Sequence, residues 1–175
     1  MKNKIKILAI SHSFLKKINT EIYLVLKHKY NFDIKLVCPK FHIDLSKKIY
    51  PDFTADEIDI DIVFNKTIFN NLRFKIYKNL LSKIKKEKIN HIFLDIDIIS
   101  LQSLILIICS YFFNYKICYF SNENNIIEEK KWLKKKFKTF LLRTFNLFFK
   151  SKIFKIFCYT QQIKKNLDYC GLKEK

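Results

Sequence analysis

The chain has 175 residues, of which 49% are hydrophobic, and it carries a formal net charge of +18. This length suits one domain with a sizeable core, and this hydrophobic content excludes an intrinsically disordered chain. Because the sequence contains a single glycine, it cannot hold the glycine-rich dinucleotide fingerprint or the P-loop. Both kinds of phosphate-binding loop are therefore excluded.

The positive charge has two interpretations. A strongly basic chain favours an anionic partner. However, lysine, isoleucine, asparagine, phenylalanine and tyrosine are all abundant here, which A/T-rich codons would produce, and dispersed charge is usually a solvated surface. Proteins that read nucleic acids rely on arginine for bidentate contacts, and this chain has only Arg73 and Arg143. We expect no nucleic-acid partner.

The cysteines indicate a reducing compartment. They are odd in number, lack metal-ligand spacing and mostly lie in apolar runs, which is typical of buried thiols in a cytoplasmic protein. They are Cys38, Cys109, Cys118, Cys158 and Cys170. The apolar run after the basic start is too short for a secretory signal, and residues 104–113 fall below the roughly 18 residues of a membrane span. We expect a cytoplasmic protein with no cofactor and no metal.

In chain order, the first predicted element is a strand within residues 4–14. Its apolar run ends at Ser11, His12 and Ser13, and a short β-branched run of this kind predicts a strand buried on both faces. Doubly wound α/β domains begin in this way, with the first strand in the middle of the sheet and ligands beyond the carboxyl ends of the strands. The three polar residues are therefore candidates for a site. The alternative is a plain turn with a serine cap.

The remaining elements alternate between strands and helices. They are helix 18–30, strand 33–37, strand 57–64, helix 71–88, strand 91–97, helix 101–113, strand 116–121, helix 128–151, strand 152–160 and helix 161–169, with Gly171 at its C-terminal cap. This order predicts one α/β domain over residues 1–175, with a mostly parallel, Rossmann-like sheet and helices on both faces. In strand 57–64, isoleucines alternate with acidic residues, which indicates a sheet edge.

Three helices have a predicted core-facing side. In helix 18–30 we expect Ile18, Ile22, Leu24, Val25 and Leu26 to pack on the sheet. In helix 71–88 the corresponding residues are Leu72, Ile76, Leu80 and Ile84. In helix 128–151 they are Leu133, Phe137, Phe140, Leu141, Thr144 and Phe148.

Two Asp-x-Asp tripeptides and four histidines are candidate site residues. Strand alternation explains Asp59 and Asp61 without a metal ion. Asp95 and Asp97 end a buried strand over the predicted site, where carboxylates are costly to place without a partner. His28 and His42 are expected at the surface, while His12 and His91 flank strands. No catalytic triad is evident.

Four segments follow a pattern that we recognise. They are KILAISHSF with DIKLVCPKF after the first helix, DIDIISLQS at residues 95–103, YFSNENN at 119–125, and the strand and helix of residues 153–175. Together they resemble the N-terminal domain of family 4-like glycosyltransferases of the GT-B fold. Within them, Asp97 takes the acidic position of a Glu-Pro-Tyr-Ser-Leu-type segment. The chain departs from the family where HSFLKKIN replaces a Gly-Gly loop and where Ile98 replaces a proline.

The resemblance implies an acceptor-side half of a transferase. The C-terminal domain, which in this family holds the nucleotide-sugar donor and the main catalytic carboxylate, is not in this chain. The whole enzyme would transfer a sugar to a glycan or lipid-linked acceptor in cell-surface polysaccharide or glycolipid assembly. The implied substrate-binding residues are Ser11, His12, Ser13, Asp97, Ser100, Glu123 and Asn124. The alternatives are a non-catalytic α/β domain that binds a partner protein or an anionic polymer, and a metal-dependent GT-A transferase that uses Asp95 and Asp97.

Residues 128–152 form the densest basic stretch and contain interleaved aromatic residues. If their apolar face covers the sheet, the other face can dock on an anionic cytoplasmic leaflet. The expected membrane contacts are Lys131, Trp132, Lys134, Lys135 and Lys138. This hypothesis places a cytoplasmic enzyme peripherally on the inner face of the membrane. The alternative is a solvated face enriched in lysine by codon usage.

Overall fold

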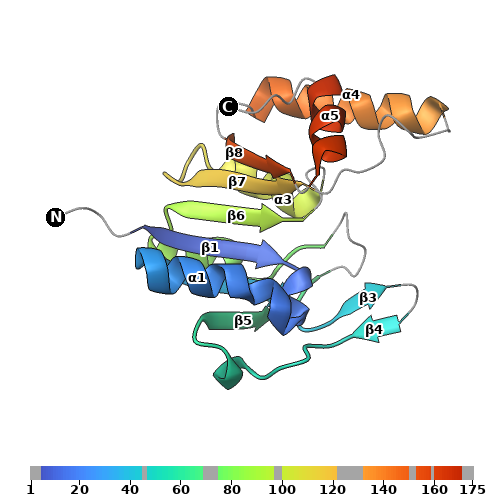
Figure 1. Ribbon diagram of the computed structural model, residues 1–175. Helices are drawn as coiled ribbons and strands as arrows, with labels where there is room; N and C mark the ends of the chain where they lie inside the picture. Colours follow the sequence, from blue (N-terminus) through green and yellow to red (C-terminus); the bar gives the residue numbers. More distant parts are fainter. Residues whose placement is uncertain are drawn as a thin grey trace.

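The computed structural model describes residues 5–44, 47–68, 75–96, 100–121, 132–149, 153–158 and 160–170. In these residues, six parallel strands form one sheet in the order β5-β2-β1-β6-β7-β8 (Figure 1). Their bounds are β1 Lys6–Ser11, β2 Asp33–Pro39, β5 Asp61–Asn65, β6 His91–Asp95, β7 Lys116–Ser121 and β8 Ile153–Cys158. A small antiparallel hairpin, β3 His42–Asp44 and β4 Lys47–Ile49, follows β2.

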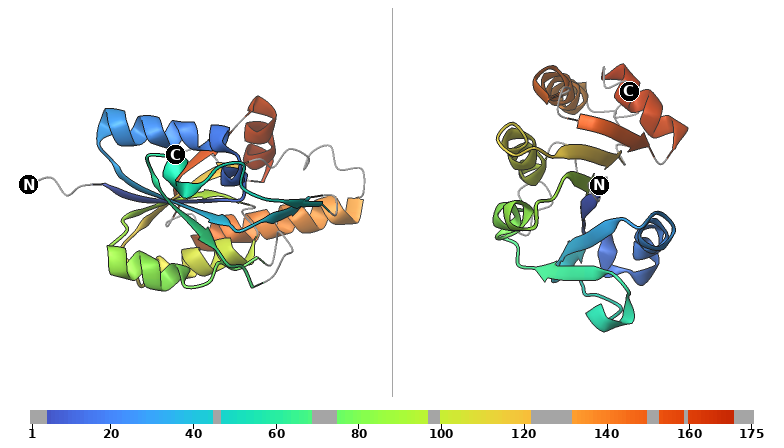
Figure 2. Two further views of the ribbon diagram at one scale, coloured as in Figure 1. Left: turned by 90° about the horizontal axis from the view of Figure 1, so that it is seen from below. Right: turned by 90° about the vertical axis from the view of Figure 1, so that its left-hand side faces the viewer.

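Helices cover both faces of the sheet. The helices α1 (Glu21–Tyr30) and α5 (Gln161–Tyr169) lie on one face. The helices α2 (Leu80–Glu87), α3 (Leu101–Cys109) and α4 (Trp132–Phe149) lie on the other (Figure 2). The fold is therefore α/β and Rossmann-like, as the order of elements predicted. No described helix combines the length and the hydrophobicity that crossing a membrane requires.

The strand β1 is buried on both faces, which confirms the prediction from its apolar run. Leu8 and Ile10 belong to the core cluster that contains Leu80 of α2. Ile7 and Ala9 belong to the second cluster, which contains Tyr23 of α1. Because successive side chains of a strand point to opposite faces, an uninterrupted apolar run supplies both cores at once. This places the end of β1 in the middle of the sheet.

The edge position of strand β5 is also confirmed. Ile58, Ile60 and Ile62 are buried, and the acidic residues between them are exposed. Asp59 pairs with Lys27 at 2.7 Å, and Asp61 pairs with Lys35 at 2.6 Å. These ion pairs give both carboxylates a partner without a metal ion. The strand itself begins later than predicted, at Asp61, because the chain turns just before it, where the Ile60 backbone N–H donates to Ile58 O at 2.8 Å.

The helix predicted over 71–88 begins later than expected, at Leu80. Residue Tyr77 forms an antiparallel bridge with Thr67, and its backbone N–H donates to Gln102 Oε1 at 2.9 Å. These bonds hold the backbone outside the helix, and Asn79 enters it from the left-handed region at φ 58°. Leu80 and Ile84 are buried as predicted, whereas Leu72 lies outside the described residues.

The predicted inner face of helix α1 is wrong in part. Tyr23 is the buried residue of this helix, while Ile18, Ile22 and Val25 are more than half exposed. Leu24 and Leu26 pack partly against the core. The apolar spacing of the sequence allowed either side of the helix to face inward, and Tyr23 provides the larger contact, edge-on to Phe14 at 5.2 Å.

The prediction that Leu133, Phe137 and Phe140 form the inner face of helix α4 is wrong. Leu133, Phe137 and Phe140 are exposed, whereas Leu142 and Thr139, on the opposite side, are buried. At 100° per residue, positions 139 and 142 lie across the helix from 133, 137 and 140. Lys135 helps to fill the inner side, since its ammonium lies 5.7 Å from the Tyr169 ring of α5. Aliphatic lysine stems can cover apolar surface in this way.

Candidate functional site

The sheet has a switch point between β1 and β6. From β1 the chain moves to β2 and then to β5, and it then returns across β1 to begin β6 on the other side. In open parallel sheets, ligands bind beyond the carboxyl ends of the strands at such a reversal. Here the two strands end side by side at Ser11 and Asp95, which are register partners.

Two serine hydroxyls hold the Asp95 carboxylate. Ser11 Oγ donates to Asp95 Oδ2 at 2.8 Å, and Ser13 Oγ donates to the same oxygen at 3.0 Å. The Ser13 backbone N–H donates to Ser11 Oγ at 2.9 Å, which fixes the loop after β1 against β6. Within the described residues these hydrogen bonds engage Oδ2, so Oδ1 is available to a ligand. Ser11 is fully buried and Asp95 is 9% exposed.

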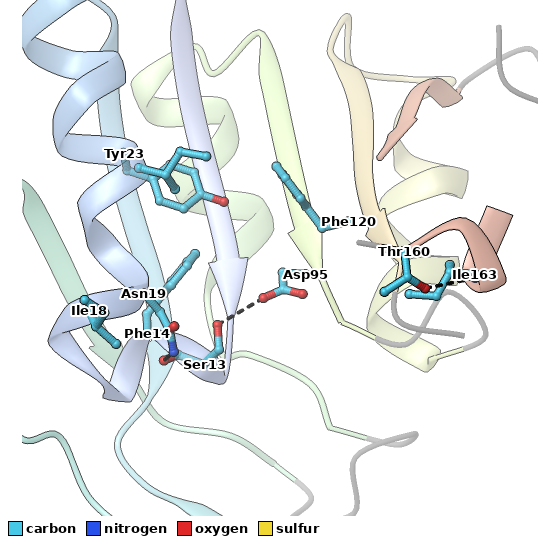
Figure 3. A pocket seen from close by; sticks show the side chains of 10 residues that line it. Ser13, Phe14, Ile18, Asn19, Tyr23, Asp95, Phe120, Thr160 and Ile163 are labelled. Carbon is cyan, nitrogen blue, oxygen red and sulfur yellow. Dashed lines mark hydrogen bonds between the residues drawn. The ribbon is translucent and has the colours of Figure 1, made fainter. Parts of the chain in front are cut away.

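A pocket of about 580 Å³ opens in front of Asp95. Figure 3 shows Ser13 and Asp95 pointing toward one another, with Tyr23 of α1 and Thr160 on different sides of the pocket. One wall is apolar and comes from α1, and the polar groups come from loops at the strand ends. The lining residues are Ser13, Phe14, Ile18, Asn19, Ile22, Tyr23, Asp95, Phe120, Thr160 and Ile163.

Aromatic rings continue the pocket surface across the sheet. Phe120 of β7, which lines the pocket, stacks on Phe157 of β8 at 5.0 Å between ring centroids. Phe93 of β6 approaches Phe120 at 5.9 Å. The pocket therefore combines a fixed carboxylate with hydroxyl groups and an aromatic surface. Such a combination suits an uncharged ligand that has both hydroxyl groups and apolar faces.

A second group of side chains lies on the β2 side of β1. The rings of His12 and His42 are 4.6 Å apart, and His42 Nδ1 lies 3.4 Å from Lys75 Nζ. His42 was expected at the surface, but it is buried because the hairpin that follows β2 folds it against the loop after β1. Burial lowers the pKa of Lys75 below its usual value. No local pattern in the sequence indicated that these three residues would meet.

The predicted site residues have different outcomes. Ser11, His12 and Ser13 lie at the carboxyl edge of the sheet, as expected. Ser100 caps α3: its Oγ accepts from the Ser103 backbone N–H at 3.2 Å. This hydroxyl therefore has a structural role in the observed fold. The remaining predicted substrate-binding residues, Asp97, Glu123 and Asn124, lie outside the described residues.

The acidic residue that the structure places in the pocket is Asp95, and it was not among the expected substrate-binding residues. Its only signal in the sequence was its place in the Asp-x-Asp tripeptide, because the partnership with Ser11 joins positions far apart in the chain. The described residues contain no group of three or more side chains that could hold a metal ion. Asp97, which a metal-dependent GT-A site would also need, is outside them.

Comparison with known proteins found no match to a family model, a curated protein or a solved structure.

Proposed function

We propose that this chain is the acceptor-side domain of a GT-B glycosyltransferase that acts in cell-surface polysaccharide or glycolipid assembly. The observation that carries the proposal is Asp95, which two serine hydroxyls hold at the mouth of a pocket at the switch point. Sugar transfer needs an acceptor hydroxyl held next to the anomeric carbon of the donor, and correct placement alone can lower the barrier substantially.

The residues of the pocket can each take a role in holding a sugar acceptor. Asp95 Oδ1 accepts a hydrogen bond from an acceptor hydroxyl, while the bonds from Ser11 and Ser13 keep the carboxylate in one orientation. The ring of Phe120 and the exposed side chain of Ile22 offer apolar surface to the faces of a sugar. Thr160 lies at the rim and caps α5, because its Oγ1 accepts from the Ile163 backbone N–H at 3.2 Å, and its hydroxyl proton can still donate to a ligand. In the complete enzyme, the donor nucleotide sugar would lie on a second domain that faces this pocket.

Binding of neutral sugars tests this proposal. Methyl glycosides and short oligosaccharides would be titrated into the ¹⁵N-labelled chain, with nucleotide sugars as a second panel. We expect glycosides to shift the resonances of Ser13, Asp95 and Phe120, and nucleotide sugars to bind weakly or not at all. Asp95→Asn should weaken glycoside binding by about tenfold or more, because it removes a charged hydrogen-bond acceptor.

The matched control is Asp56→Asn, which makes the same change at an exposed position far from the pocket residues in sequence. Tight binding of a nucleotide sugar together with no glycoside binding would overturn the proposal. If instead a polyanion binds, and Asp95→Asn binds it equally well, the chain is a non-catalytic binding domain.

We also propose that the chain lies peripherally on an anionic membrane, with the exposed face of α4 against the lipid. This face carries Leu133 (74% exposed), Phe137 (61%) and Phe140 (65%), and Trp132 (62%) lies on its flank at the start of the helix. Large exposed apolar patches mark interaction surfaces. Lys136, whose ammonium lies 4.0 Å from the Trp132 ring, and the exposed Arg143 lie on the same flank as Trp132, beside this apolar face.

The charge of the chain favours an anionic membrane over a second copy of the chain as the occupant of this face. Two copies, each with a net charge of +18, repel one another. An anionic leaflet attracts the lysines and accepts the aromatic side chains at the level of the headgroups. The face proposed to contact lipid is therefore the apolar face that the sequence predicted to pack against the sheet. Of the lysines first expected to bind lipid, Lys135 and Lys138 are half-buried, Lys131 lies outside the described residues, and the side chain of Lys134 is not described.

A further inference from the structure

The cluster formed by His12, His42 and Lys75 lies beside the pocket but has no part in the roles described so far. We propose that this basic cluster binds a phosphate group of the ligand. Lys75 is 5% exposed and His42 is 8% exposed, while His12 is half-buried and connects the cluster to the surface. The three side chains come from separate segments: the loop after β1, the start of β3 and the segment before α2.

Lys75 is the reason to expect an anion. Removing an ammonium group from water costs free energy, which a nearby carboxylate normally offsets. In the parts of the chain that the structure describes, no carboxylate lies within ion-pair distance of Lys75, and its ammonium donates to His42 Nδ1 at 3.4 Å. An imidazole nitrogen does not neutralise the charge. An anionic ligand would do so.

The arrangement suits phosphate in particular. When His42 Nδ1 accepts from the ammonium, the imidazole proton is on Nε2, so His42 is itself a donor there. His12 adds a further ring nitrogen, since the two rings are in contact at 4.6 Å. Phosphate offers several acceptor oxygens in different directions, and lysine is a common partner for it as a point charge. A buried ammonium beside two imidazole rings therefore matches phosphate better than a single carboxylate.

The position of the cluster predicts the class of ligand. His12 lies between Ser11 and Ser13 in the chain, so the basic cluster and the Asp95 carboxylate flank the same loop. A ligand that spans both would present a hydroxyl to Asp95 and a phosphate to Lys75. This assignment of a phosphorylated acceptor rests on the proposed function, whereas the phosphate site itself does not. The phosphate could belong to a sugar phosphate, a lipid headgroup or the free ion.

Calorimetry with three soluble probes at constant pH and ionic strength tests the site. The probes are inorganic phosphate, a hexose 1-phosphate and dihexanoyl phosphatidic acid. We expect saturable binding of phosphate-bearing probes, weakened by about tenfold or more in both Lys75→Met and His12→Gln. The probe that binds most tightly identifies the source of the phosphate group.

Lys78→Gln is the matched control, because Lys78 is an exposed lysine close in sequence that lines a different hollow, with Lys40 and Lys66. If Lys75→Met does not fold, His12→Gln decides the outcome, since His12 is half-buried. The proposal is overturned if no probe binds, or if Lys78→Gln weakens binding as much as His12→Gln does. Glycoside binding without phosphate binding would refute this site and leave the proposed function intact. Phosphate binding without glycoside binding would support the phosphate site and refute the proposed sugar binding.

Discussion

Ser11 and Asp95 are 84 residues apart in the chain, yet they are register partners on β1 and β6, and the Ser11 hydroxyl donates to Asp95 Oδ2 at 2.8 Å. This bond crosses the point where the order of the strands reverses. It gives a buried carboxylate a defined orientation in front of the pocket. Stability and ligand binding should therefore both depend on it.

Ser11→Ala should lower the free energy of unfolding by about 1–3 kcal/mol, because it leaves a buried charged acceptor with one donor fewer. Chemical denaturation measures this change. Ser82→Ala is the matched control, since Ser82 is exposed on α2 and alanine favours a helix. A loss in Ser11→Ala no larger than that of the control would contradict the role of the hydrogen bond. In a double-mutant cycle with Asp95→Asn, the two losses should not add, because the residues are in contact.

The stability of the domain should fall as the pH is lowered through the range in which histidine titrates. Burial, with a contribution from Lys116, lowers the pKa of His91 below its usual value of 6.5. The unfolded chain therefore binds the proton at a higher pH than the folded chain does. The stability contributed by neutral His91 is present above pH 6.5 and is lost as the pH falls from there toward the folded pKa.

Urea denaturation of the wild type and of His91→Gln, from about pH 8 to about pH 5, measures this effect. The variant should have a shallower loss of stability with acid. His28→Gln serves for comparison, because His28 is exposed. Parallel curves for His91→Gln and the wild type would show that another group controls the acid response.

The exposed face of α4 should bind anionic vesicles. Flotation with phosphatidylserine-containing liposomes should recover the wild type at low salt and less of it at high salt, because screening weakens surface attraction. Leu133→Ser/Phe137→Ser should reduce binding through lost apolar contact. Lys136→Gln/Arg143→Gln should reduce it by about 1 kcal/mol per charge and should make it less dependent on salt.

Two variants control for composition. Phe112→Ser changes an aromatic residue that is 80% exposed outside α4, and Lys85→Gln/Lys86→Gln removes two exposed charges from α2. Both should float as the wild type does. If the wild type remains unbound at low salt, or if all four variants float equally well, the membrane role of α4 is refuted.

The sequence by itself determined the α/β class, the central position of β1 and the edge position of β5. In these cases the signal is local: an uninterrupted apolar run requires burial on both faces, and strict alternation requires burial on one. The carboxyl-end location of Ser11, His12 and Ser13 also followed, because a parallel sheet brings all its strand ends to one edge.

Only the tertiary structure decided which residues meet. Helix α4 has apolar side chains on more than one side, so its periodicity alone could not choose between Leu142 and the Leu133–Phe137–Phe140 side as the one that packs inward. The pairing of Ser11 with Asp95 depends on strand register, and the burial of His42 beside Lys75 depends on how a hairpin folds back. Each is a contact between distant segments, and its free energy depends on the partner and not on the local sequence.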